Sequence, residues 1–378
     1  MDYLLLVSAF FIGSLVSFFL IPTIVKIAHL KSLMDEPGGR KAHVNPIPPM
    51  GGLAIMLGTL ASTMLMTQVE IDPRFLIVVF SAITFMMIGL GDDLIAMSAR
   101  RKGFFQFIMI CVVVWSGVRI ESLFGLLGIT DLPVIVQLGL TIVFITGLTN
   151  AYNLIDGIDG LAAGIGIIAS IALGIAFLLV GSMSFALLSF GLAGGLMGFL
   201  GHNFNPAKIF MGDTGSLPVG FLLAVLSVEF LKISHGLGMM TGMHNFGPVI
   251  LFALLAVPVM DTLQVMIGRM IRGRSPFSAD RNHIHHLLLA CGLSVMYATL
   301  ALYTYTLGLV GLVLAGFFMG ISNQTILVII FFFALASVIG LHGYRSYRRR
   351  KYLEALAEPA AAPHVKMIHM KKVKGKAS

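Results

Sequence analysis

Carboxylate and amide side chains recur at short spacing in two segments of this sequence. Asp92 and Asp93 are adjacent in GLGDDL. Four further residues follow one another at three-residue steps in NAYNLIDGIDGL, namely Asn150, Asn153, Asp156 and Asp159. This spacing stacks side chains on one side of a helix, and oxygen donors of these kinds suit Mg²⁺, which keeps substrate phosphates among its ligands. The two segments therefore predict chemistry on a phosphorylated substrate at a divalent ion.

The adjacent acids Asp92 and Asp93 need cations nearby, because like charges at this separation raise each other's proton affinity. Arg100, Arg101 and Lys102 follow within the same loop and supply that charge. We interpret the pair as catalytic or phosphate-organising. The alternative is an ordinary acidic pair at the membrane interface.

Two further aspartates are candidates by position. Asp213 lies in the polar turn MGDTGS, before an apolar stretch. Asp-Thr-Gly alone is a weak signal, but on the same membrane face as the other acids it predicts a third metal or phosphate group. Asp261 lies inside an apolar segment, which indicates either a functional acid or the structural partner of a cation such as Arg269.

A histidine segment, SPFSADRNHIHHLLL, completes the polar motifs. Arg281, His283, His285 and His286 present several hydrogen-bond donors, which suits phosphate or a sugar amide. A zinc site is one alternative, although no cysteine accompanies the three imidazoles. A plain basic loop beside the membrane is the other.

Composition places the whole chain in a membrane. Of its 378 residues 57% are hydrophobic and 11% are charged, with a mean hydropathy of +0.96. A soluble domain carries about 25% charged residues, so this chain has too little polar surface to cover a globule in water. Cys111 and Cys291 are expected to be free thiols, and nothing in the sequence predicts a nucleic-acid partner.

The apolar segments predict an all-α, polytopic integral membrane protein with about eleven transmembrane helices. A spanning helix needs roughly 20 apolar residues. The N-terminus resembles a retained first span rather than a signal peptide. The expected spans lie near 3–25, 50–67, 73–91, 104–118, 133–150, 161–180, 184–201, 217–234, 246–268, 296–318 and 324–343.

Basic residues predict the orientation of these spans. With the N-terminus outside and the C-terminus in the cytoplasm, all but Arg74, Arg119 and Lys232 of the 25 Lys and Arg residues lie inside. All of the polar motifs then share the cytoplasmic face. We expect residues 1–343 to form one catalytic transmembrane domain, and 344–378 to form a basic cytoplasmic tail without regular structure, attracted to anionic lipid.

Four motifs in this order resemble the polyprenyl-phosphate N-acetylhexosamine-1-phosphate transferases, of the glycosyltransferase 4 type. They are GDD at 91–93, NAYNLIDGIDGL at 150–161, FMGDTGS at 210–216 and SPFSADRNHIHHLL at 275–288. The resemblance covers residues 1–343, and the last motif is similar to the WecA/TagO-like branch rather than to the HHH run of MraY. It departs from the family at Ala96, where many relatives carry a third acid.

The resemblance implies a reaction and a role for each motif. N-acetylglucosamine-1-phosphate passes from UDP-N-acetylglucosamine to undecaprenyl phosphate, in the bacterial inner membrane, with Mg²⁺ required and Mn²⁺ as a substitute. This is the first membrane step of a cell-surface polysaccharide. The implied metal ligands are Asn153 and Asp213. The implied catalytic residues are Asp92, Asp93, Asp156 and Asp159. The implied substrate-binding residues are Lys102, Asn150, Asp159, Arg281, His283, His285 and His286.

Several alternatives stay open from sequence alone. The first alternative is the same reaction with another UDP-N-acetylhexosamine as donor. The second is a route through a covalent aspartyl intermediate instead of direct transfer. A secondary transporter of an anionic solute is the alternative class, which predicts broken helices near the bilayer midplane and repeated halves. A structural scaffold would not need three acidic loops on one face. A homodimer is compatible with the resemblance.

Overall fold

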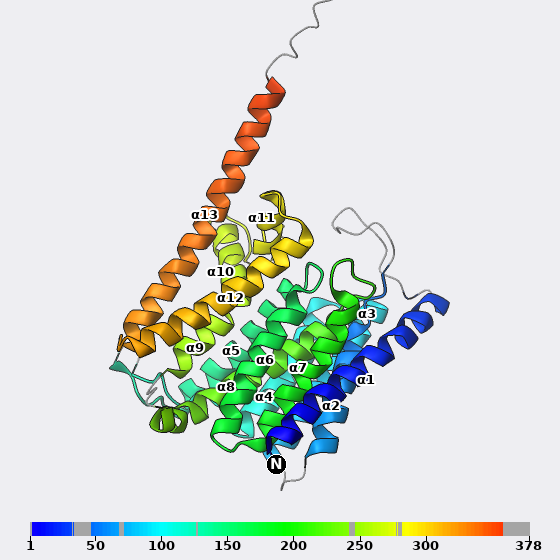
Figure 1. Ribbon diagram of the computed structural model, residues 1–378, viewed down its shortest axis with the longest axis vertical. Coiled ribbons are helices and arrows are strands. Elements are labelled where there is room, and N and C mark those ends of the chain that lie inside the picture. Colours follow the sequence, from blue (N-terminus) through cyan, green and yellow to red (C-terminus); the bar gives the residue numbers. More distant parts are fainter. Residues whose placement is uncertain are drawn as a thin grey trace, which may run out of the picture.

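Helices make up nearly all of the chain that the computed structural model describes (Figure 1). The described residues are 2–31, 33, 47–67, 72–125, 128–241, 246–276, 278 and 282–357. In chain order the helices are α1 (Asp2–Leu30), α2 (Gly51–Met66), α3 (Pro73–Ile95), α4 (Ala99–Trp115), α5 (Val134–Ile155), α6 (Leu161–Leu179), α7 (Met183–Asn203), α8 (Asp213–Thr241), α9 (Gly247–Leu254), α10 (Ala256–Ile271), α11 (Ile284–Ala290), α12 (Val295–Phe318) and α13 (Asn323–Ala357). No strand is present in these ranges, so the predicted all-α class is confirmed for them.

Ten of the predicted spans each coincide with one of these helices, and the span predicted near 246–268 is divided between α9 and α10. By length and composition, eight of the described helices can cross a membrane, or nine when α9 and α10 count as one bent span. Of the two other predicted spans, α2 is apolar but only 16 residues long, and α4 begins with a basic stretch. The chain is therefore a multi-span membrane protein, and the count of eleven stays a prediction.

Helix α8 lies at the centre of the bundle. In its apolar stretch 89% of the residues are buried, more than in any other described span. It packs on α3 and α5, and the rings of Phe85 and Phe221 stack with centroids 4.4 Å apart. A Cβ on Gly52 would lie 2.0 Å from the backbone nitrogen of Gly215, so α2 crosses the start of α8 at backbone contact.

Helices α9, α10, α12 and α13 lie to one side of the bundle formed by α1 to α8 (Figure 1). They share a second apolar core, which includes Val249, Leu309 and Ile330. Between α9 and α10 the chain bends by 72° at Leu255. The bend turns α10 toward α11, the short helix of the histidine segment.

The structure differs from the expected domain boundary. Helix α13 continues through residue 343 to Ala357, so the first part of the expected unstructured tail is helical. Residues 358–378 lie outside the described ranges. The end of α13 and the N-terminus lie at opposite ends of the molecule (Figure 1).

Candidate active site

Asp93 joins the end of α3 to the start of α8. A helix leaves its first backbone N–H groups without partners inside the helix, and its N-terminus favours negative charge. The Asp93 carboxylate accepts hydrogen bonds from the backbone N–H groups of Asp213, at 3.0 Å, and Thr214, at 2.8 Å. It also accepts one from the Thr214 hydroxyl, at 2.6 Å. Asp93 therefore caps α8 from a neighbouring helix.

Lys102 lies between two carboxylates from different helices. Its ammonium group donates to Asp92, with Nζ and Oδ2 3.0 Å apart, and forms an ion pair with Asp213. The second oxygen of Asp92 accepts from the backbone N–H of Met97. The basic start of α4 thus offsets part of the negative charge where α3 ends and α8 begins.

Asn153 reaches the same carboxylate from α5. Its amide nitrogen donates to Oδ1 of Asp213, at 2.8 Å, and to the hydroxyl of Ser216, at 2.7 Å. Three helices therefore meet at Asp213, which is the first residue of α8. Sequence reasoning did not single out Ser216, although its position three residues after Asp213 on a helix was the available signal.

The four-residue stack predicted from Asn150 to Asp159 is wrong. Helix α5 ends at Ile155, so Asp156 and Asp159 lie beyond it and their three-residue spacing no longer places them on one helix face. Asn150 is exposed and donates to the carbonyl of Thr146, 2.8 Å away on its own helix. The Asp159 carboxylate accepts from the backbone N–H of Ala207, at 3.0 Å, and so holds the segment between α7 and α8.

Asp156, directly after α5, shows the charge balance of the site. Burial, and after it the carboxylates of Asp213, Asp93 and Asp159 in that order, raise its pKa to about 7. These acids therefore lie close enough to oppose ionisation of Asp156. The negative charge of these carboxylates exceeds the single positive charge of Lys102, and such an excess stabilises a bound cation.

The histidine segment meets the loop after α5. A Cβ on Gly157 would lie 2.4 Å from Nε2 of His285, so the imidazole packs directly on the Gly157 backbone. Burial, together with the neighbouring His286, lowers the pKa of His285 to about 3. The ring is therefore neutral at physiological pH and both donates and accepts hydrogen bonds.

Asp261 fixes the start of α11. One of its oxygens lies 2.6 Å from Nδ1 of His283, and the other accepts from the backbone N–H of Ile284. The structure shows Asp261 binding the histidine segment, a partner that neither of the two expected roles had named. The rings of His283 and His285 are parallel, with centroids 5.6 Å apart, and His286 lies beside His285 at 4.3 Å. Arg281 lies outside the described residues.

The donors at the start of α8 fit magnesium better than zinc. Among the described residues no group of three His, Cys, Asp or Glu side chains is placed to hold a metal ion. Mg²⁺ does not need such a group, because proteins usually hold it with one or two carboxylates while substrate phosphates and water complete its shell. Asp213 offers the carboxylate. Asn153 uses its amide nitrogen for hydrogen bonds, which leaves its amide oxygen available as a metal ligand.

Comparison with known proteins places this sequence among the glycosyl transferases. The profile of glycosyl transferase family 4 matches residues 75–231. A Bacillus subtilis protein named probable undecaprenyl-phosphate N-acetylglucosaminyl 1-phosphate transferase is 34% identical over 345 residues, covering 89% of this chain and 92% of the relative. A decaprenyl-phosphate N-acetylglucosaminephosphotransferase of Mycolicibacterium smegmatis is 36% identical, over 71% of each chain. The undecaprenyl-phosphate alpha-N-acetylglucosaminyl 1-phosphate transferase of Escherichia coli K12 is 30% identical, over 74% of this chain and 76% of the relative.

Proposed function

The chain belongs to glycosyl transferase family 4, and from this membership we propose that it transfers N-acetylglucosamine-1-phosphate from UDP-N-acetylglucosamine to undecaprenyl phosphate. The products are undecaprenyl-diphospho-N-acetylglucosamine and UMP. One observation carries the assignment. Asp92, Lys102, Asn153 and Asp213 converge at the start of α8 in a chain that covers 92% of a relative named for this transfer.

The reaction joins two anions, so its first requirement is electrostatic. An oxygen of the lipid phosphate attacks the β-phosphorus of the donor, and the bond from that phosphorus to the UMP oxygen breaks. Lys102 supplies a positive charge at the point of attack, and catalysis of phosphoryl transfer rests on such charge and on positioning. The neutral ring of His285 orients the sugar or the diphosphate by hydrogen bonds.

Of the two adjacent acids, Asp92 is the better candidate for direct contact with the acceptor. Both oxygens of Asp93 bind the start of α8, whereas Asp92 shares Lys102 with Asp213. A phosphomonoester has a second pKa near 6, so the lipid phosphate is largely a dianion at neutral pH and needs no strong base. Asp92 orients this phosphate and accepts any remaining proton. Direct transfer therefore needs no covalent aspartyl intermediate.

Magnesium is part of the proposal. Asp213 and Asn153 would hold the ion, and Mn²⁺ would substitute for it. When bound, it would withdraw electron density from the diphosphate and offset its charge. The carboxylates of Asp93, Asp156 and Asp213 lie close enough to repel one another, and this concentration of negative charge supports a cation here.

We place the site on the cytoplasmic side of a bacterial inner membrane, with the N-terminus outside. The basic residues of α4 and of the end of α13 support this orientation. The bend at Leu255 resembles what a transporter requires. However, the residues around the bend, from Ala253 to Val257, are all apolar and buried, so it offers no ion site.

The test is an assay of purified protein in detergent with UDP-[¹⁴C]N-acetylglucosamine, undecaprenyl phosphate and MgCl₂. We expect a labelled lipid product together with UMP, and competition by unlabelled UDP-N-acetylglucosamine. Stronger competition by UDP-N-acetylgalactosamine would replace the proposed donor. Solute flux in proteoliposomes without any lipid product would reject the transferase assignment.

A further inference from the structure

The cytoplasmic extension of α13 carries a row of polar side chains that the chemistry described so far does not use. His342, Arg345 and Arg348 follow at three-residue spacing, so they lie on one side of the helix. This side faces α10 and α11, since all three residues bind these helices or the segments that flank them. The row lies at and beyond the boundary where sequence reasoning ended the catalytic domain.

Two residues of this row hold the chain just before α11. The Arg345 guanidinium donates to the side-chain oxygen of Asn282, with a distance of 2.8 Å. His342 bonds to the oxygen of Gln264, at 2.9 Å, and the nitrogen of Gln264 donates to the backbone carbonyl of Asn282, at 2.6 Å. Asn282 is therefore bound by both α10 and α13, one residue before His283.

The third residue holds the chain just after α11. Arg348 donates to the backbone carbonyl of Cys291, which follows the last residue of the helix. The guanidinium also packs on Gly292, whose φ of +94° belongs to the left-handed region. Because α11 has only seven residues, it has little stability of its own and depends on contacts at its ends.

We propose that His342, Arg345 and Arg348 are positioning residues, through which the cytoplasmic end of α13 clamps both ends of α11 and keeps His285 against Gly157. The contacts that form this clamp lie within the chain and do not depend on which reaction it catalyses. Its effect on catalysis rests on the function proposed above, because His285 orients the donor only if that reaction takes place. Small displacements of a substrate-orienting group lower the turnover number, since positioning acts in the transition state.

Cys291 is a native reporter of the clamp. The residue is 6% exposed, at the end of α11 that Arg348 binds. The experiment uses the full chain with Cys111→Ala, so that Cys291 is the single thiol, and measures labelling by a hydrophilic maleimide. We expect Arg345→Ala and Arg348→Ala to raise the labelling rate about tenfold, the factor expected when a charged hydrogen bond that restrains local opening is lost.

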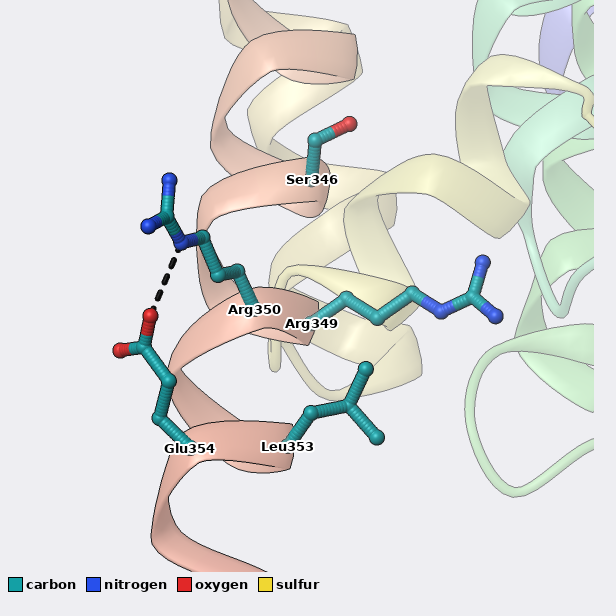
Figure 2. A pocket seen from close by; sticks show the side chains of 5 residues that line it. All are labelled: Ser346, Arg349, Arg350, Leu353 and Glu354. Atoms are coloured by element: carbon teal, nitrogen blue, oxygen red, sulfur yellow. Dashed lines mark hydrogen bonds and ion pairs between the residues drawn. The ribbon is translucent and has the colours of Figure 1, made fainter. Parts of the chain in front are cut away.

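Arg350→Ala is the matched control. Arg350 lies on the same helix but bonds to Glu354, at 2.8 Å, on a surface of α13 that faces away from α11 (Figure 2). The substitution removes the same charge from the same element. We expect the labelling rate and the turnover number of this variant to equal those of the parent.

Kinetics then separate positioning from a general loss of structure. We expect Arg345→Ala to lower kcat about tenfold, with KM for UDP-N-acetylglucosamine within about twofold, and Arg345→Lys to recover most of the loss. Asn282→Ala should produce the same defect, and the double variant with Arg345→Ala should be no worse than either single variant. A merely structural role would lower the yield of folded protein without this split or rescue.

The proposal is overturned if Arg345→Ala and Arg348→Ala label at the rate of Arg350→Ala, or if their kcat is unchanged. If Arg345→Ala does not fold, Arg345→Lys and Asn282→Ala decide the question by the same two measurements. Parent protein without transferase activity would instead reject the proposed function. The labelling result would still decide whether α13 clamps α11.

Discussion

Asp92 and Asp93 are neighbours in the sequence but differ in what they bind. Asp93 gives both oxygens to the start of α8, and Asp92 bonds to Lys102 and to the backbone of Met97. Adjacent residues on a helix point in directions about 100° apart, so one faces α8 while the other faces α4. The sequence therefore predicts that this pair belongs to the site, but it cannot predict which member is structural.

We expect different consequences when each acid becomes an amide. Asp93→Asn replaces one accepting oxygen by a donor that opposes the N–H groups of α8, so the loss of this cap should destabilise the protein by about 1–2 kcal/mol. Asp92→Asn should lower kcat by at least about a hundredfold and leave UDP-N-acetylglucosamine binding intact. Thermal melts, calorimetric donor binding and turnover of the two purified variants check this. Wild-type turnover in Asp92→Asn would remove that residue from the mechanism.

His285 should make stability depend on pH on the acidic side. Its pKa is about 3 in the folded chain, below its ordinary value of 6.5, because burial disfavours the charged ring. Between these values only the unfolded state binds the proton, so stability is lost as the pH falls below about 6.5. We expect the apparent melting temperature to decrease from pH 6.5 to pH 4, and the decrease to be smaller in His285→Gln. His29→Gln, at an exposed position on α1, is the control; an equal slope in His285→Gln and the parent would contradict the burial argument.

At the scale of elements, close backbone contacts set the geometry of the site. A Cβ on Gly89 of α3 would lie 2.1 Å from the carbonyl oxygen of Asp213, so this glycine lets α3 reach the start of α8. The same approach brings Asp93 within hydrogen-bond distance of Thr214. The close packing of α3 on α8 therefore also sets the positions of the polar residues at the site.

Gly89→Ala tests this link. The added methyl group must push α3 away from α8, which should destabilise the fold by about 1–3 kcal/mol and lower turnover, since Asp93 no longer caps α8. Gly139→Ala is the matched control, because a Cβ there meets nothing within 4 Å. Thermal melts and turnover of both variants provide the comparison. Equal behaviour of the two alanine variants would show that α3 has room to move.

Hydropathy predicted the position of every long helix, because the membrane demands an apolar run of fixed length. It did not predict the bend at Leu255, since the run stays apolar through it. Nor did it predict α11 or the extension of α13, which depend on contacts made by Asp261, Arg345 and Arg348. The family resemblance implied Asn153 and Asp213 as metal ligands, and the structure joins their side chains by a hydrogen bond. The predicted stack from Asn150 to Asp159 failed because helix α5 ends at Ile155, before Asp156 and Asp159.

Basic residues are distributed unevenly between the two ends of the molecule. At the end opposite the candidate site, Arg74 bonds to Asp72, and Lys232 bonds to the carbonyl of Gly117 and lies 3.6 Å from Glu121. Two of the three basic residues predicted to lie outside thus bind carboxylates or a carbonyl group at this end of the molecule. The much larger basic excess lies at the other end, on α4 and α13.

The orientation can be tested by labelling in intact cells. In a background with Cys111→Ala and Cys291→Ala, we expect Ser322→Cys, in the exposed turn between α12 and α13, to react with an impermeant maleimide. Ser346→Cys, on the exposed end of α13 that we place in the cytoplasm, should react only after the cells are permeabilised. The reverse pattern would place the candidate site outside and would separate it from a cytoplasmic donor.

The central claim is that the groups gathered around Asp213 move a sugar phosphate, and not a sugar alone, onto a lipid phosphate. UDP-N-acetylglucosamine labelled with ³²P at its β-phosphate tests this most directly, in detergent with undecaprenyl phosphate and MgCl₂. We predict that the label enters the lipid product with one UMP released per product, and that Asp213→Asn lowers both by at least about a hundredfold. Label that stays in water-soluble UDP while the lipid gains the sugar, or undiminished transfer by Asp213→Asn, would contradict the account.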